Sequence, residues 1–300
     1  MGVDELGSAG KGTSTGISGS VSRRRFLIAA GGALAGLGGA GTDAFVWAPR
    51  RVELVREEVV VPTLPAELAG LRIAHLSDIH LYHGLHPAAR RASEIVSEAA
   101  PDITIITGDL AESVGQLRHV RSFVEGCHGR LATVVTLGNW EHEVGITPSH
   151  MERTCERAGA TFLFNEALTL TVGEHRLSIV GLDDPLSGAP DPARALREVP
   201  SGAVTVWGFH APGYADVVMR QALPAPALAL SGHTHGGQIR LPLLPPITPT
   251  GSGRFLAGWY RDSFAPLYVS RGVGTTSIRA RFRCPPEVAV FTLQPLAVSR

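Results

Sequence analysis

The sequence has almost no lysine, few cysteines and no surplus of charge, and each shortage excludes a class of protein. Lys11 is the only lysine among 27 basic residues, and 27 acidic residues balance them to a formal net charge of zero. A neutral chain offers no general attraction to a nucleic-acid backbone, so any affinity for phosphate must be local. Cys127, Cys155 and Cys284 are too few and too scattered for a disulfide framework. We therefore expect no nucleic-acid partner and at most one disulfide.

The first 47 residues differ in composition from the rest of the chain. Residues 1–20 are mostly Gly, Ser and Thr, which predicts a disordered arm because little apolar surface is available to offset the ordering entropy. Residues 21–47 carry Arg23–Arg25 before Phe26, Leu27 and a Gly/Ala/Leu run, as in the basic and apolar parts of a signal peptide. The paired arginines resemble a twin-arginine export signal. A basic patch before a buried helix is the alternative, but so many glycines make a poor helix interior.

This segment predicts where the protein works and what it meets on the way. A twin-arginine signal implies contact with the twin-arginine export machinery and a periplasmic or extracellular location. No clean Ala-x-Ala cleavage site follows, and Thr42-Asp43-Ala44 is only a passable substitute. Left uncleaved, residues 26–47 reach the roughly 20 residues needed to cross a bilayer once. Anchoring to the cytoplasmic membrane and release from it therefore stay open as alternatives.

From Arg51 onward, short β-rich apolar runs alternate with stretches of helical spacing. The predicted strands are 52–61, 71–76, 103–107, 133–137, 177–181, 204–209, 227–230, 267–270 and 288–293. The predicted helices are 87–99, 114–125, 148–158 and 192–199. The alternation predicts one layered α/β domain over residues 51–300, a length that usually holds a single core. The proline-rich stretch 241–253 is typical of a long surface loop.

Side chains that ligate metals follow the ends of the predicted strands, one strand after another. They are Asp78, His80, Asp109, Asn139, His210, His233 and His235. Ligands of α/β sheets bind at the carboxyl ends of strands, so these side chains can converge although they are far apart in sequence. Gly108, Gly138 and Gly232 stand beside them and allow a tight backbone with positive φ.

The order of these residues is similar to that of a known family. Asp78-Ile79-His80, Gly108-Asp109, Gly138-Asn139, His210 and Gly232-His233-Thr234-His235 resemble the calcineurin-like metallophosphoesterases. The resemblance covers residues 71–291 and implies a β-sandwich flanked by helices, of the α/β (α+β) class. It implies one metal on Asp78, His80, Asp109 and His235, and a second on Asp109, Asn139, His210 and His233. Gly236-Gly237-Gln238-Ile239 and Cys284-Pro285-Pro286-Glu287 resemble the bacterial exported group of the family.

The implied reaction is hydrolysis of a phosphate ester by water. Two divalent ions about 3.5–4 Å apart lower the pKa of a water and hold the phosphoryl oxygens, and Asp109 would be the shared carboxylate. Imidazole with carboxylate suits Mn, Fe, Zn or Co better than Mg or Ca. The substrate is expected to be a phosphomonoester or phosphodiester, by analogy with exported relatives an envelope lipid or a wall polymer. A metal-binding envelope protein without catalysis is the alternative.

Trp140 departs from the family pattern, in which a histidine usually follows the asparagine ligand. An indole N–H donates a hydrogen bond but cannot titrate, so a general acid must come from elsewhere or be absent. His142, two residues further on, is the predicted catalytic acid, and His83 is a second candidate. The same substitution motivates the non-catalytic alternative.

Two further clusters leave their roles open. Arg271, Arg279, Arg281 and Arg283 either recognise an anionic substrate, since guanidinium pairs well with phosphate, or form a solvated strand face. Trp259 and Tyr260 either line a substrate groove or cover the edge of the core.

Overall fold

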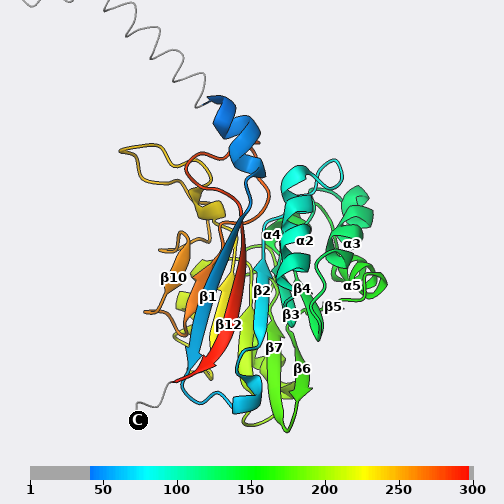
Figure 1. Ribbon diagram of the computed structural model, residues 1–300, viewed down its shortest axis with the longest axis vertical. Helices are drawn as coiled ribbons and strands as arrows, with labels where there is room; N and C mark the ends of the chain where they lie inside the picture. Colours follow the sequence, from blue (N-terminus) through cyan, green and yellow to red (C-terminus); the bar gives the residue numbers. More distant parts are fainter. Residues whose placement is uncertain (1–40, 297–300) are drawn as a thin grey trace, which may run out of the picture. The chain divides into compact units, whose positions relative to one another are not determined.

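Two mixed sheets of six strands each form the centre of the fold (Figure 1). The computed structural model describes residues 41–296, so the predicted arm over residues 1–20 and the arginine pair of the export segment lie outside the described residues. The order of the first sheet is β1 (Glu53–Val61), β12 (Glu287–Pro295), β2 (Arg72–Leu76), β3 (Ile103–Thr107), β4 (Ala132–Thr136) and β5 (Thr161–Phe162). The order of the second sheet is β10 (Gly258–Tyr260), β11 (Leu267–Val269), β9 (Leu228–Ser231), β8 (Val204–Gly208), β7 (His175–Gly181) and β6 (Glu166–Val172).

Neighbouring strands at the centre of each sheet run parallel. β2 to β5 are parallel in the first sheet, and β7, β8, β9 and β11 are parallel in the second. All five residues of β3 are buried, as expected for a strand that is covered on both faces. The carboxyl ends of the parallel strands in each sheet therefore lie at the same edge of that sheet.

Alternate side chains of each central strand face two different layers. In β2 and β3, Ile73 and Ile105 pack between the sheets with Val206 of β8, whereas Ala74 and Ile106 pack against helices. This follows from the two-residue period of a strand, which sends successive side chains to opposite faces. The two sheets thus share one apolar core, and each has a second core on its outer face.

Helices cover both outer faces. On the first sheet these are α2 (Pro87–Ala99), α3 (Leu117–Glu125) and α5 (Pro148–Arg157), drawn on the right of Figure 1. On the second sheet these are α6 (Pro192–Ala195) and α7 (Ala215–Val218). α4 (Asn139–Glu143) is a short helix that begins three residues after β4. Single turns complete the set: η1 (Asp43–Trp47), η2 (Ala48–Arg50), η3 (Ala66–Leu68), η4 (Val114–Gln116), η5 (Leu196–Glu198), η6 (Pro212–Tyr214) and η7 (His235–Gly237).

The sequence encodes both ends of α2. Pro87 occupies the first turn, where its missing N–H costs nothing, and His86 Nδ1 accepts a hydrogen bond from Ala89 N at 3.1 Å. The helix ends at Ala99, and the capping residue Ala100 adopts a left-handed conformation with φ 43°. The predicted helix over residues 87–99 is confirmed.

The α/β sandwich flanked by helices is confirmed, with several strands and helices added or divided. β5, β6, β10, α4 and α7 were not predicted. The predicted helices over residues 114–125 and 192–199 each combine a single 3₁₀ turn with a short α-helix. β6 forms a hairpin with β7, and Gly173 in its turn has φ 60°. Trp259 packs edge-on against Tyr268 and Phe291, with ring centroids 5.3 and 5.5 Å away, so it covers the core edge.

Two negative findings complete the fold. All three cysteines are buried and free, so none of them forms a disulfide. Within residues 41–296, no helix has the length and apolar character required to traverse a bilayer.

Candidate metal centre

Six side chains converge where the carboxyl edges of the two sheets meet. Asp78, His80 and His235 form one group, and Asp109, His210 and His233 form a second, with one potential ligand atom per residue lying within 4.8 Å of the others in each group. They follow strands β2, β3, β8 and β9, so each group draws on both sheets. We call these six residues the cage. None of them is more than 4% exposed.

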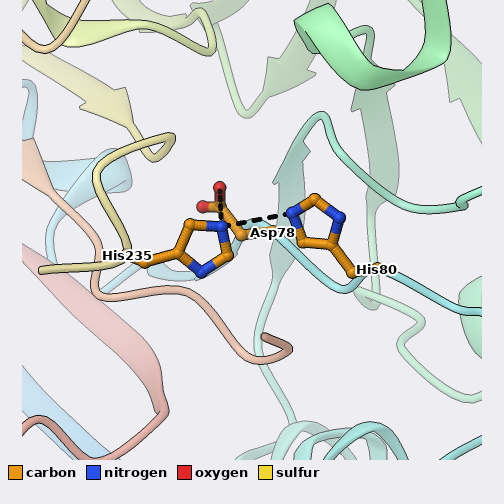
Figure 2. Close-up of side chains that lie close together, drawn as sticks. All are labelled: Asp78, His80 and His235. Atoms are coloured by element: carbon orange, nitrogen blue, oxygen red, sulfur yellow. Dashed lines mark hydrogen bonds and ion pairs between the residues drawn. The ribbon is translucent and has the colours of Figure 1, made fainter. Parts of the chain in front are cut away.

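The carboxylate of Asp109 lies between the two groups. Its Oδ2 atom is 3.2 Å from His210 Nε2 and 3.4 Å from His80 Nε2. Asp78 Oδ1 is 3.4 Å from His235 Nε2 and 4.0 Å from His210 Nε2. In Figure 2, dashed lines join one ring nitrogen of His235 to the carboxylate of Asp78 and to the ring of His80, whose Nε2 is 3.2 Å from that of His235. The two groups therefore form one connected set of donors.

Asn139 has a buried oxygen that lacks a partner. Its Nδ2 donates to Glu143 Oε1 at 2.9 Å, while its Oδ1 makes no hydrogen bond. The next residue, Trp140, donates its backbone N–H to Asp109 Oδ1 at 2.9 Å, which brings Asn139 close to the cage. A buried carbonyl oxygen without a partner is costly, and a bound cation would satisfy it.

Hydrogen bonds to backbone carbonyls fix the ring orientation of two histidines. His210 Nδ1 lies 2.7 Å from Thr107 O, and His233 Nε2 lies 2.7 Å from Thr250 O. A carbonyl can only accept, so these nitrogens carry protons. The opposite ring nitrogens, His210 Nε2 and His233 Nδ1, are the ones that a metal would use. Such outer contacts hold metal-binding histidines in the required tautomer.

Burial controls the charge of the cage. It lowers the pKa of His80, His233 and His235, and it raises the pKa of Asp78. The three histidines are therefore neutral, with lone pairs available to a metal.

One ion pair in the cage runs against this trend. Burial opposes protonation of His210, but the adjacent Asp109 raises the pKa of His210 well above its ordinary value. Burial likewise opposes ionisation of Asp109, but His210 lowers its pKa. Two carboxylates and four imidazoles in a dry site form a donor set that fits divalent Mn, Fe, Zn or Co.

The backbone is strained at the cage itself. Asp78, His80, Asp109, His233 and His235 have φ values of 55°, 49°, 54°, 69° and 49°. The left-handed region costs non-glycine residues of order 1–3 kcal/mol each, and such residues cluster at functional sites. The sequence predicted positive φ at Gly108, Gly138 and Gly232, but of these three only Gly108 has it, with φ 78°. The structure places it instead on five of the six cage residues.

Two of those glycines are required for a different reason, close packing. A Cβ at Gly138 would overlap the carboxylate of Asp109, and a Cβ at Gly232 would overlap Ser77 and Asp78. The absence of a side chain therefore allows the backbone to reach the two carboxylates.

Comparison with known proteins identifies the family. Residues 71–237 match the model of the calcineurin-like phosphoesterases. The chain belongs to this family. It is a metal-dependent phosphoesterase, and its sandwich of two sheets flanked by helices is the metallophosphoesterase fold.

Bacterial metallophosphoesterases match nearly the whole chain. YkuE of Bacillus subtilis, a metallophosphoesterase, is 29% identical over 286 residues, which cover 91% of this chain and 98% of the relative. Phosphodiesterase YaeI of Escherichia coli is 29% identical over 282 residues, which cover 91% and 99%. UDP-2,3-diacylglucosamine pyrophosphatase LpxG of Chlamydia trachomatis is 26% identical over 313 residues, which cover 82% and 92%.

Glu141 supports the loops that carry the metallophosphoesterase centre, a role that the sequence analysis did not predict. Its side chain is fully buried, and Oε2 accepts hydrogen bonds from the backbone N–H groups of Asp109 at 2.9 Å and Gly138 at 2.8 Å. Oε1 accepts from Leu110 at 2.6 Å and Ala111 at 3.3 Å. One carboxylate thus ties the loop after β3 to the loop after β4. Its place two residues after Asn139 was the only available signal.

Trp140 packs on the cage. Its ring meets His80 edge-on, with centroids 5.6 Å apart and an angle of 77° between the planes. In this metallophosphoesterase the position therefore supplies an apolar cover for a ligand residue.

His142 is paired with a buried carboxylate. Its Nε2 lies 2.7 Å from Asp183 Oδ1, and this hydrogen bond raises the pKa of His142. The charge of Asp184 also raises the pKa of His142, and it raises the pKa of His210. His83, the other candidate acid, is exposed and contacts the ring of Tyr82.

The four arginines of the predicted cluster do not share one role, either as a site for an anionic substrate or as a solvated strand face. Arg281 is fully buried, and its guanidinium donates to the backbone carbonyls of residues 271, 272, 274 and 284. Arg271 pairs with Glu53 and Glu287, and Arg279 pairs with Glu112. These pairs were not predictable because the partners are distant in sequence. Of the four arginines, Arg283 is exposed.

Arg281 helps to position Asp78. The segment that it holds donates Val273 N to Ser77 O at 3.0 Å and Gly274 N to Asp78 O at 2.6 Å. The buried arginine therefore supports the backbone of the first cage residue.

Proposed function

We propose that this metallophosphoesterase hydrolyses a phosphate ester outside the cytoplasm with two divalent ions bound in the cage. Asp78, His80, Asp109 and His235 would hold one ion, and Asp109, Asn139, His210 and His233 the other. The observation that carries the proposal is the carboxylate of Asp109, which lies 3.2 Å from a histidine of one group and 3.4 Å from a histidine of the other. That position is the one a shared ligand needs.

The chain's own residues hold the donors in place. When bound, the two ions supply an activated water and positive charge for the phosphoryl oxygens. Glu141 holds the backbone N–H of Asp109, and the backbone N–H of Trp140 holds its carboxylate. The carbonyls of Thr107 and Thr250 fix the rings of His210 and His233. Because the cage is buried, its charges act through a low dielectric and need little reorganisation.

His142 is the proposed proton donor to the leaving oxygen. Trp140 cannot take this role, because its indole does not titrate. The hydrogen bond from His142 to Asp183 favours the protonated ring, as a general acid requires, and the ring is partly exposed.

The proposed location and substrate class rest on the sequence and on the relatives. The Arg23 and Arg24 pair supports export through the twin-arginine route, with or without lasting attachment to the membrane. YaeI is named a phosphodiesterase, and LpxG a pyrophosphatase of a diacylglucosamine nucleotide. The first name supports a phosphodiester and the second an acylated substrate. The proposed substrate is a phosphodiester or phosphomonoester of the envelope, either a lipid or a wall component.

Metal analysis combined with an assay tests the proposal. Purified protein loaded with Mn should hold two ions per chain and hydrolyse bis-p-nitrophenyl phosphate. Asp109→Asn should reduce turnover by more than the roughly 10–100-fold typical of outer contacts, and should lower the metal content. Metal binding without turnover of any ester would instead identify a non-catalytic metal-binding envelope protein.

A further inference from the structure

An apolar groove opens beside the cage at His235. Its volume is about 420 Å³, and its lining includes His235, Ile239, Leu241, Ile247, Pro249 and Ile278. Small-molecule sites usually measure about 300–1,000 Å³, so the groove has the size of a ligand site. Because His235 belongs both to the cage and to the groove lining, a molecule lying in the groove would contact a residue of the cage.

Hydrogen bonds hold one wall of the groove to the segment that follows His235. Gln238 Oε1 accepts from Thr276 N at 3.0 Å, and Gln238 Nε2 donates to Ile278 O at 2.8 Å. Ile239 forms a β-bridge with Phe282. The groove is therefore part of the folded structure and does not depend on a ligand for its shape.

The rim of the groove is apolar and exposed. The rim loop, residues 241–253, extends away from the sheets at the upper left of Figure 1. Leu243 is fully exposed, Ile247 is 86% exposed and Leu244 is 60% exposed, and Ile278 across the groove is 52% exposed. Single exposed apolar side chains are ordinary, but several around one groove mark a binding surface.

A second hollow adjoins the groove on the side of the start of the described chain. Thr275 and Arg279 line a hollow with Phe45 and Arg50, while the residues between them, 276–278, line the groove. Phe45 and Trp47 are 62% and 59% exposed, and Arg50 and Arg51 beside them are exposed as well. Aromatic side chains next to arginines are typical of segments at a membrane surface. In the sequence, the apolar run of the export segment leads directly into these residues.

We propose that the groove binds the alkyl or acyl chain of the substrate while the phosphate ester lies at the cage. The substrate is then a lipid phosphate ester that the enzyme takes from a membrane surface. This inference rests on the proposed function, because it adds a chain to the substrate of the same centre. An alkyl chain is the occupant that this groove fits, because the groove adjoins His235 of the cage, where the phosphate ester of the same molecule would lie.

Two matched pairs of compounds test the groove. The first pair is p-nitrophenyl methyl phosphate and p-nitrophenyl octyl phosphate, which share the bond to be cut and differ only in the chain. The second pair, methylphosphonate and octylphosphonate, reports binding by calorimetry without turnover. In Mn-loaded protein, kcat/KM should be roughly tenfold or more higher for the octyl ester than for the methyl ester. The affinity for octylphosphonate should exceed that for methylphosphonate by a similar factor, because methylenes buried in an apolar pocket strengthen binding.

Substitutions locate the chain. Ile247→Glu and Ile278→Glu should bring both octyl-to-methyl ratios close to one, because a carboxylate at either position opposes entry of a chain. Leu131→Glu is the matched control, since Leu131 is 37% exposed and precedes β4 at the opposite edge of the sheet. This variant should keep the wild-type ratios. Thermal melting of all three variants checks that they are folded.

The outcomes separate this inference from the proposed function. Equal kcat/KM values for the octyl and methyl esters and equal affinities for the two phosphonates, with the methyl ester still hydrolysed, would contradict chain binding in the groove. The proposed hydrolase function would stand. Tighter binding of octylphosphonate than of methylphosphonate, without turnover of either ester, would contradict the proposed hydrolysis. Chain binding in the groove would stand. A dimer that Ile247→Glu dissociates, with no gain from the octyl chain, would show that a second copy covers this face.

Discussion

The cage and the rim loop are opposite exceptions to the usual rule that polar side chains are exposed and apolar side chains are buried. The cage buries charged and imidazole side chains, none more than 4% exposed, whereas the rim loop exposes Leu243 completely and Ile247 by 86%. A buried polar group and an exposed apolar patch are the two informative exceptions to the usual distribution of polarity. They meet at His235, which belongs to the cage and lines the groove. In the proposed function, the two regions serve different parts of one ligand: the charged cage binds a phosphate, and the apolar surface binds what is attached to it.

If the cage depends on buried support, removing that support should have the largest effect. Glu141→Ala leaves four backbone N–H groups without their acceptor, and each unsatisfied buried group costs about 1–3 kcal/mol. We expect the free energy of unfolding in urea to fall by at least about 3 kcal/mol, and metal affinity to fall roughly 10–100-fold. Chelator competition measures the second effect. Glu152→Ala, on the exposed side of α5, is the control, and a urea midpoint equal to wild type would refute the role of Glu141.

Removal of the metal should have the next largest effect, a loss of thermal stability that requires an intact cage. Ions that bind only the folded protein at about 100 times their Kd stabilise it by about 2.7 kcal/mol. For a domain of this size that corresponds to a fall in Tm of roughly 5–10 °C after chelation. Calorimetric scans before and after chelation measure it. Asp109→Asn should show little change on chelation, and an equal change would mean that the ions bind elsewhere.

The smallest effect is expected at the edge of the cage, in the pH dependence of Asp183→Asn. Asp183 raises the pKa of His142, and a general acid must be protonated, so activity should decline as pH rises through that pKa. Loss of the carboxylate lowers the pKa of His142 and moves the alkaline limb of kcat to lower pH. Esters with poor leaving groups should show this shift, and p-nitrophenyl esters should not. An alkaline limb that stays in place for both would exclude His142 as the acid.

The sequence predicted the cage better than the residues that support it. Asp78, Asp109 and His235 were found because they follow apolar strands, and both the strand pattern and the position of the ligand are local features. Glu141 and Arg281 were missed, since a buried carboxylate or guanidinium is distinguished only by its partners. For Arg281 these partners are backbone carbonyls that no side-chain pattern marks.

The groove could not be predicted from the sequence for a similar reason. The stretch 241–253 was correctly expected to be a loop, but composition alone does not show that its apolar side chains stand beside His235. Ile278 on the opposite wall is 43 residues further along the chain than His235, and only the fold brings them together. β6 was also missed, although its pairing with β7 in a hairpin is local.

Each half of the cage takes residues from both sheets, and this has a consequence for how the chain is held together. His80 and His235 are 155 positions apart in sequence, yet their Nε2 atoms lie 3.2 Å from each other. A cation bound there acts as a reversible cross-link that closes a very long loop, the kind of closure that restricts an unfolded chain most. In a protein whose three cysteines are all free, bound ions would take the part that a disulfide plays elsewhere.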